Sequence, residues 1–213
     1  MLGSARWSPD GKEIAFDRRI DGRPEIFIIK NDGTGLRRLT NSLGSTRPCW
    51  SPDGAWIYFT LFTPGPTDLD QIWRMPVTGG EMTQITVNGG VEPIISPDGK
   101  RVYYSNHHHL YQKDLPSGAE MPVPGLENIQ IDRYWEISNS AIFYVPVLSS
   151  QLNDKSGIYR FDLGTRTSTL FKRLDKLPIP GMLGVSVTLD ERRLAIGLVN
   201  QPLGDIMMIK GWK

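Results

Sequence analysis

Three consecutive histidines, His107, His108 and His109, are the residues of this chain best suited by type to metal chemistry. Imidazole nitrogens bind zinc and related metals, and in a tight loop His107 and His109 would lie on one side. No aspartate, glutamate or cysteine accompanies them at ligand spacing within the segment. They also fill a loop between two expected strands, so the sequence predicts a solvated loop rather than a metal site.

A second set of candidates consists of carboxylates that recur in one short context. Trp-Ser-Pro-Asp-Gly occurs at 7–11 and at 50–54, and Ser-Pro-Asp-Gly returns at 96–99. Serine, proline, aspartate and glycine in this order are typical of a type I turn. A residue that recurs from repeat to repeat serves each repeat, so Asp10, Asp53 and Asp98 are predicted to accept hydrogen bonds from turn amides and not to catalyse.

The segment 184–188, Gly-Val-Ser-Val-Thr, is a candidate for a nucleophile because it begins like the hydrolase pattern G-x-S-x-G. It lacks the final glycine and falls on an expected strand, whereas the nucleophile of that pattern occupies a strand-to-helix turn. No phosphate-cradling loop or dinucleotide fingerprint occurs. The single cysteine, Cys49, is predicted to be a small buried residue of a strand. We therefore predict no catalytic, cofactor-binding or metal-binding residue, no cofactor and no enzymatic activity.

The elements that carry these residues follow from the spacing of the motif. Its serines are 43 and then 45 residues apart, a period typical of repeat architectures. The chain has 22 Gly and 16 Pro, scattered along its length, which indicates many turns and short strands. Each repeat reads as four strands, which predicts an all-β fold, a β-propeller of four-stranded antiparallel blades, with about five blades present. As one domain over 1–213, the expected blades span approximately 4–40, 46–86, 91–123, 130–173 and 183–210.

The later repeats depart from the pattern in two ways. The fourth has no Ser-Pro-Asp-Gly turn, and the fifth replaces it with Asp190, Glu191 and Arg192. The fifth is also expected to lack its outer strand. Because nothing in the chain can supply that strand, we expect a C-terminal piece of a longer propeller of roughly six to eight blades. The alternative is a five-bladed ring with one three-stranded blade.

The tryptophans occupy positions related by the repeat. Trp7, Trp50 and Trp135 come late in the first strands and are predicted to pack between neighbouring blades. Two further residues, Trp56 and Trp73, are predicted to lie in blade cores. The sixth, at position 212, is expected to be exposed.

Four-stranded units carrying Trp-Ser-Pro-Asp-Gly at 7–11 and 50–54 resemble the WD-type β-propeller repeat of the TolB-like family. The segment 204–209, Gly-Asp-Ile-Met-Met-Ile, also resembles the last strand of larger bacterial proteins with a C-terminal propeller. Those proteins place a winged-helix or kinase domain upstream. The resemblance implies a propeller whose partner is another protein or an upstream domain of the same polypeptide.

Bulk composition excludes some partners. The net charge of +1 offers no electrostatic attraction to nucleic acid, and no apolar run reaches the ~20 residues needed to cross a membrane. No signal peptide fits before the first repeat, so an exported protein, for example a periplasmic one, would need a signal on preceding sequence. The compartment is therefore not determined.

The leading hypothesis is a non-catalytic protein-interaction or sensing module. The alternatives are an accessory propeller of a prolyl-oligopeptidase-type peptidase and a small-ligand-binding propeller. Loops at the ends of the propeller are the expected contact surfaces. They comprise residues 41–46, 63–70, 88–90 and 177–180.

Overall fold

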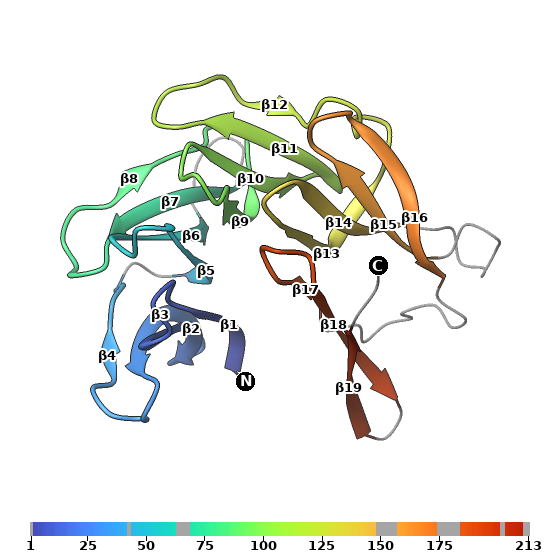
Figure 1. Cartoon of the computed structure of the whole chain (residues 1–213). Helices are drawn as coiled ribbons and strands as arrows, with labels where there is room; N and C mark the ends of the chain where they lie inside the picture. The colour runs from blue at the N-terminus through green and yellow to red at the C-terminus, as the bar shows by residue number, and fades with distance from the viewer. Residues whose placement is uncertain are drawn as a thin grey trace. The chain divides into compact units, whose positions relative to one another are not determined.

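The computed structural model describes residues 2–41, 44–62, 69–147, 157–173, 184–200 and 203–210, and these contain β-strands and no helix. The strands form five sheets in which each strand lies beside the next one in sequence (Figure 1). Four sheets have four strands and the fifth has three, as the sequence predicted. In the described part, no helix has the length and apolar character needed to cross a bilayer.

The strands group by sheet. The first three sheets contain β1 (Leu2–Trp7), β2 (Glu13–Ile20), β3 (Arg23–Lys30) and β4 (Arg37–Arg38); β5 (Ser45–Trp50), β6 (Trp56–Phe62), β7 (Asp70–Pro76) and β8 (Thr83–Gln84); and β9 (Val91–Ile95), β10 (Arg101–Asn106), β11 (His109–Asp114) and β12 (Met121–Pro122). The last two contain β13 (Ile131–Ile137), β14 (Ala141–Pro146), β15 (Gly157–Asp162) and β16 (Thr167–Arg173); and β17 (Gly184–Val187), β18 (Arg193–Asn200) and β19 (Leu203–Lys210).

The chain divides into two compact units. The first consists of residues 1–106 and 111–121 and holds the first two sheets and most of the third. The second consists of residues 107–110 and 122–213 and holds the fourth and fifth sheets. Each unit is described by itself below, and the arrangement of all sheets in one domain over 1–213 stays a prediction.

In the second and fourth sheets, the second strand is almost entirely buried. In β6 the five residues from Ile57 to Leu61 are all buried, and in β14 the five from Ala141 to Val145 are all buried. A strand covered on both faces reads as a continuous apolar run rather than as an alternation of polar and apolar residues. The apolar segments of the second strands thus indicate sheets that stack face to face.

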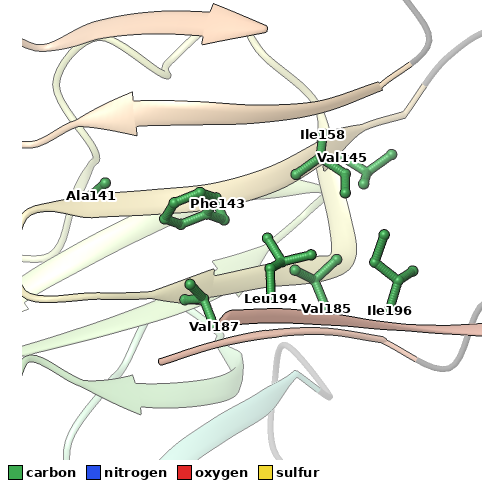
Figure 2. Packing of buried hydrophobic residues seen from close by; sticks show 8 residues of the cluster. All are labelled: Ala141, Phe143, Val145, Ile158, Val185, Val187, Leu194 and Ile196. Atoms are coloured by element: carbon green, nitrogen blue, oxygen red, sulfur yellow. The ribbon is translucent and has the colours of Figure 1, made fainter. Parts of the chain in front are cut away.

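Apolar side chains fill the space between neighbouring sheets of each unit. In the second unit, four residues of the fourth sheet face four residues of the fifth (Figure 2). They are Ala141, Phe143, Val145 and Ile158, and opposite them Val185, Val187, Leu194 and Ile196. In the first unit, Ala15, Ile26 and Ile28 of the first sheet cluster with residues of the second sheet, including Ile57 and Phe59. Burial of this kind contributes roughly 25 cal/mol per Å² of apolar surface.

The tryptophans only partly follow the predicted pattern. Trp50 is 7% exposed and donates its indole N–H to the Arg6 carbonyl of the preceding sheet at 3.0 Å, and Trp135 is buried as well. The prediction for Trp7 is wrong, because 60% of this residue is exposed. Trp50 packs against the sheet that precedes its own. Among the described residues of the first unit, no sheet precedes the one that carries Trp7.

The two tryptophans assigned to blade cores lie at core edges. Trp56 and Trp73 are partly buried and pack against the clusters of the first unit. The guanidinium of Arg74 lies over the Trp56 ring, 4.2 Å from its centre, so this indole also takes part in a cation–π contact. The tryptophan at 212 lies outside the described residues.

Candidate functional site

The first strands of the first three sheets carry an extra residue near their start. In β5 the pairing with β6 shifts between Thr46 and Cys49, and in β9 the pairing with β10 shifts after Val91. The strand pairs β1–β2 and β13–β14 show the same type of irregularity. Such β-bulges bend a strand and re-aim a side chain, and they are frequent beside functional sites. In the first unit, the first strand β5 contacts both neighbouring first strands, β1 and β9.

Two of these bulges hold a charged residue in a strained conformation. Arg47 and Glu92, here called the bulge pair, stand four residues before Ser51 and Ser96 and have φ angles of 55° and 57°. Only glycine adopts the left-handed region without penalty, and another residue loses about 1 kcal/mol or more there. The surrounding structure must therefore impose this conformation.

A side chain of the preceding sheet fixes each bulge. The Arg47 amide donates to Oδ1 of Asp17 at 3.3 Å, and the Glu92 amide donates to Oγ1 of Thr60 at 3.1 Å. Asp17 and Thr60 occupy the same repeat position, nine residues after Ser8 and Ser51. The two bulges are thus built by one repeated device, which satisfies an amide that leaves the regular strand pairing.

The side chains of the bulge pair contact each other. Nε of Arg47 lies 3.3 Å from Oε1 of Glu92, with 24% of the arginine side chain and 19% of the glutamate side chain exposed. The pair joins β5 to β9. A guanidinium offers fixed donors that match a carboxylate, and a carboxylate accepts from cationic or amide groups. The arrangement is suited to polar recognition by a preformed surface.

The predicted contact loop 88–90 is anchored by its own backbone. Glu120 accepts from the Asn88 amide at 3.2 Å, and Gln71 accepts from the Gly89 amide at 3.1 Å. A Cβ at Gly90 would lie 2.9 Å from the Tyr104 ring, so glycine is required there. The backbone donors of the loop are thus engaged within the molecule. Of the other predicted loops, residues 42–43, 63–68 and 177–180 lie outside the described residues.

The histidine segment forms a tight hairpin turn. His107 and His108 connect β10 to β11 with φ angles of 47° and 66°, and both are exposed, which confirms the predicted solvated loop for these two. His109 belongs to β11, and its Nδ1 is buried with no hydrogen-bond partner among the residues that the structure describes. The described residues contain no group of three or more histidine, cysteine, aspartate or glutamate side chains placed to hold a metal ion.

This turn provides a stability prediction. Two-residue hairpin turns with positive φ at both positions favour Asn-Gly. The double variant His107→Asn with His108→Gly is therefore expected to raise the free energy of unfolding by about 1–2 kcal/mol, because it relieves two left-handed histidines. Urea denaturation monitored by tryptophan fluorescence measures the change. An unchanged or lower stability would show that the histidines make contacts that offset their strain.

The recurrent aspartates hold turns, as predicted. Oδ1 of Asp10 accepts the Ser8 hydroxyl at 2.7 Å and the Lys12 amide at 3.1 Å, and Asp53 and Asp98 accept the corresponding groups of their own turns. These hydrogen bonds, the serine hydroxyl first, hold the pKa of each of the three carboxyls below its ordinary value. Each carboxylate is thereby engaged in its turn.

The fifth repeat makes the same turn with the substituted residues Asp190, Glu191 and Arg192. The Thr188 hydroxyl donates to Asp190 at 2.6 Å, and the Arg192 amide donates to the same oxygen at 3.0 Å. Glu191 occupies the glycine position with a φ of 58°. The fourth repeat instead makes a shorter turn, which Ser138 closes by donating its amide to the Ala141 carbonyl.

Glu191 connects the turns of the fourth and fifth sheets. Its carboxylate accepts the hydroxyls of Ser138 and Ser140 at 2.6 and 2.5 Å, and Nε of Arg160 donates to it at 2.9 Å. Burial alone would raise the pKa of Glu191. The hydrogen bonds from Arg160, Ser138 and Ser140 outweigh that effect and hold the pKa below its ordinary value. This Glu191 cluster is a second polar centre, located in the second unit.

The remaining candidates lie in regular strands. Ser186 belongs to β17 and pairs with Ala195 of β18, so it does not occupy a strand-to-helix turn. Cys49 lies half-buried in β5, where its thiol contacts the Trp50 carbonyl.

The bulge pair, Arg47 and Glu92, was not identified from the sequence. The available signal was a pair of opposite charges at the same repeat position, four residues before the motif serine in two successive repeats.

Comparison with known proteins identifies the family. A family model described as the TolB beta propeller domain matches residues 1–120 of the 213. The Tol-Pal system protein TolB of Anaeromyxobacter dehalogenans is 32% identical over 97 residues, which cover 46% of this chain and 21% of that protein. The peptidase YuxL of Bacillus subtilis is 28% identical over 138 residues, which cover 47% of this chain and 21% of that protein. The chain spans about a fifth of the length of these two relatives.

A solved structure agrees with the fold. The crystal structure of TolB from Acinetobacter baumannii superimposes with a TM-score of 0.77 at 19% identity, covering 99% of this chain and 52% of that one. At this identity the likeness concerns the fold alone. The family model, by contrast, matches more than half of the residues. The chain therefore belongs to the TolB beta propeller domain family.

Proposed function

We propose that this TolB-like propeller is a non-catalytic module that binds another protein through a surface that includes the bulge pair, Arg47 and Glu92. The observation that carries the proposal is the left-handed conformation of both residues in successive first strands. Strained conformations of this kind persist only where neighbouring groups impose them, and they cluster at ligand and switch sites. In each bulge here, a side chain of the preceding sheet supplies that support.

The geometry suits recognition of a protein surface. The bulge pair is half-buried and held on strands, so little conformational entropy remains to be lost on binding. A partner that presents a carboxylate to Arg47 and a cationic group to Glu92 would form complementary pairs, which favour specificity. The non-catalytic part of the proposal is supported by the engagement of Asp10, Asp53 and Asp98 in their own turns.

The relatives suggest a first partner to test. TolB relatives carry the name of the Tol-Pal system, so we propose Pal, or another component of such a system, as the partner. An upstream domain of the same polypeptide would use the same chemistry. In both cases the complementary charges belong to a protein surface.

Calorimetric titration tests this function. The full chain is titrated with the soluble Pal protein of the same organism. Arg47→Gln and Glu92→Gln each remove one charge and keep a polar side chain in the bulge. Each is expected to weaken binding by about tenfold, equivalent to 1.4 kcal/mol. Lys100→Gln, an exposed change beside the turn at the opposite end of the third sheet, is the control and should bind like the original chain.

Two outcomes contradict the proposal at different points. Binding of Pal that neither bulge variant weakens would reject the bulge pair as contact surface. Absence of Pal binding by the original chain would reject Pal as the partner. Circular dichroism of each variant shows whether the fold is retained.

A second candidate function is an accessory propeller of a serine peptidase, which the similarity to peptidase YuxL favours. In that case the chain is part of a longer polypeptide that carries the catalytic residues. Labelling of the source organism's proteins with a fluorophosphonate probe, followed by capture with an antibody against this chain, distinguishes the two. A labelled polypeptide much heavier than 23.9 kDa would establish the peptidase alternative.

A further inference from the structure

The outer strand of the fourth sheet differs from the others in length. The fourth strands β4, β8 and β12 have two residues each, whereas β16 (Thr167–Arg173) has seven. A very short edge strand is a common protection against pairing with another chain. Of the four-stranded sheets, only the fourth lacks this protection in the part of the chain that the structure describes.

The strand β16 presents a free edge. It pairs with β15 on one side, and no described strand pairs with its other side. Six of its seven residues are exposed. Alternate backbone N–H and C=O groups of an edge strand point outward and can pair with an added strand.

Side-chain contacts hold β16 in place as a template. Phe171 meets the buried Phe143 edge to face, with ring centres 5.2 Å apart. The Ser168 hydroxyl lies 3.0 Å from the Tyr144 hydroxyl. Leu170 covers Gly157 so closely that a Cβ there would lie 2.5 Å from it. An edge fixed in this way loses little entropy when another strand joins it.

The charges along this edge have one sign. Lys172 and Arg173 end the strand, Arg166 immediately precedes it, and β16 contains no acidic residue. Among the described residues, none of the three cations forms an ion pair. The nearby carboxylate of Asp162 is already engaged by Arg160 at 2.9 Å. Within the described part of the chain, the edge therefore has positive charge without a counter-charge at both ends.

We propose that the outer edge of β16 binds an extended, acidic segment of a partner protein, which adds to the fourth sheet as a fifth strand. Main-chain hydrogen bonds supply affinity in this mode of recognition, and side chains supply selectivity. Acidic residues at the ends of the segment pair with Arg166 at one end and with Lys172 and Arg173 at the other. Opposite charges across neighbouring strands are stabilising, and like charges are destabilising.

The charge pattern favours such a segment over a second copy of the chain. Antiparallel pairing of two β16 strands centred on Leu170 would place Lys172 opposite Ser168 and Arg173 opposite Thr167. All the cations would then remain unmatched. Parallel pairing in register would place like charges side by side, which is unfavourable. An acidic segment would neutralise these cations and would place no like charges side by side.

Fluorescence anisotropy of the full chain with a labelled peptide, EDVTVTVDE, tests the proposal. Saturable binding is expected, together with slower amide hydrogen exchange confined to residues 167–173. The double variant Lys172→Glu with Arg173→Glu should bind at least about tenfold more weakly and should instead bind the basic peptide KKVTVTVKK. The matched control, Lys30→Glu with Lys100→Glu, reverses two exposed lysines of the first unit and should leave the affinity unchanged.

Three results would overturn the proposal. The first is the absence of saturable binding of the acidic peptide. The second is protection from exchange that lies outside residues 167–173. The third is a concentration-dependent dimer in analytical ultracentrifugation whose formation protects the same residues, which would make a second copy the occupant. Thermal denaturation of the double variant confirms that lost binding does not reflect unfolding.

Discussion

Trp50→Ala is expected to lower the free energy of unfolding by about 3–5 kcal/mol, whereas Trp7→Ala should lower it by less than about 0.5 kcal/mol. The two residues occupy the same position of the same five-residue motif. Trp50 is buried in the cluster between the first and second sheets, and Trp7 is 60% exposed. Removal of a buried indole loses apolar burial and leaves a cavity, whereas removal of an exposed one does neither.

Part of the Trp50 effect comes from its hydrogen bond. The indole N–H donates to the Arg6 carbonyl, and its removal leaves that carbonyl without this donor. Trp50→Phe keeps most of the apolar ring and removes the donor, so it should cost about 1–2 kcal/mol, between the two alanine variants. The loss of unfolding free energy should therefore increase in the order Trp7→Ala, Trp50→Phe, Trp50→Ala. This order distinguishes the contribution of the hydrogen bond from that of apolar burial.

Chemical denaturation followed by far-ultraviolet circular dichroism measures these differences. This signal is preferred to fluorescence because each substitution removes an indole. A large loss for Trp7→Ala would mean that another surface covers this residue in solution. A loss below about 1 kcal/mol for Trp50→Ala would contradict the packing between the first and second sheets.

Local sequence rules predicted the sheets because the information they need is local. Ser51, Pro52 and Gly54 determine a turn by their own backbone preferences, and the repeated spacing extends that turn to a strand order. In the described part of the chain, the fifth sheet consists of the three strands β17, β18 and β19. These local rules predicted the strands and turns but not the bulge pair.

The bulge pair could not be predicted in this way because its conformation depends on distant residues. The Arg47 amide donates a hydrogen bond to Asp17, which lies 30 residues earlier in another sheet. The φ of Arg47 therefore reflects how two sheets pack, and arginine itself disfavours that conformation. Trp7 illustrates the same limit, since its motif describes the residue but not whether a sheet covers it.

Glu191 also breaks a local rule and gains a compensating contact. Glycine is expected at its position, and each of the three Ser-Pro-Asp-Gly turns has glycine there. Arg160, 31 residues earlier, supplies the ion pair that makes glutamate favourable. The turn of the fifth sheet thus carries a residue that a neighbouring sheet stabilises.

Glu191→Ala is expected to destabilise the second unit by about 2 kcal/mol at pH 7. The change removes the acceptor of Ser138, Ser140 and Arg160, and alanine retains the left-handed strain. The figure lies below that for a fully buried ion pair because 19% of the Glu191 side chain and 25% of the Arg160 side chain are exposed. Glu191→Gly should cost only about 1 kcal/mol, because glycine relieves the strain while the contacts are lost.

The effect of Glu191 should also depend on pH. Its pKa is lower in the folded chain than in the unfolded chain, where the ordinary value is about 4.3. The ionised carboxylate therefore contributes its full stability above that value, and the contribution is lost as pH falls through the lowered pKa of the folded state. Denaturation of the original chain and of Glu191→Gln at pH 7 and near pH 3 should show a difference that shrinks in acid. A difference that is the same at both pH values would mean that Glu191 acts through neutral hydrogen bonds and not through its charge.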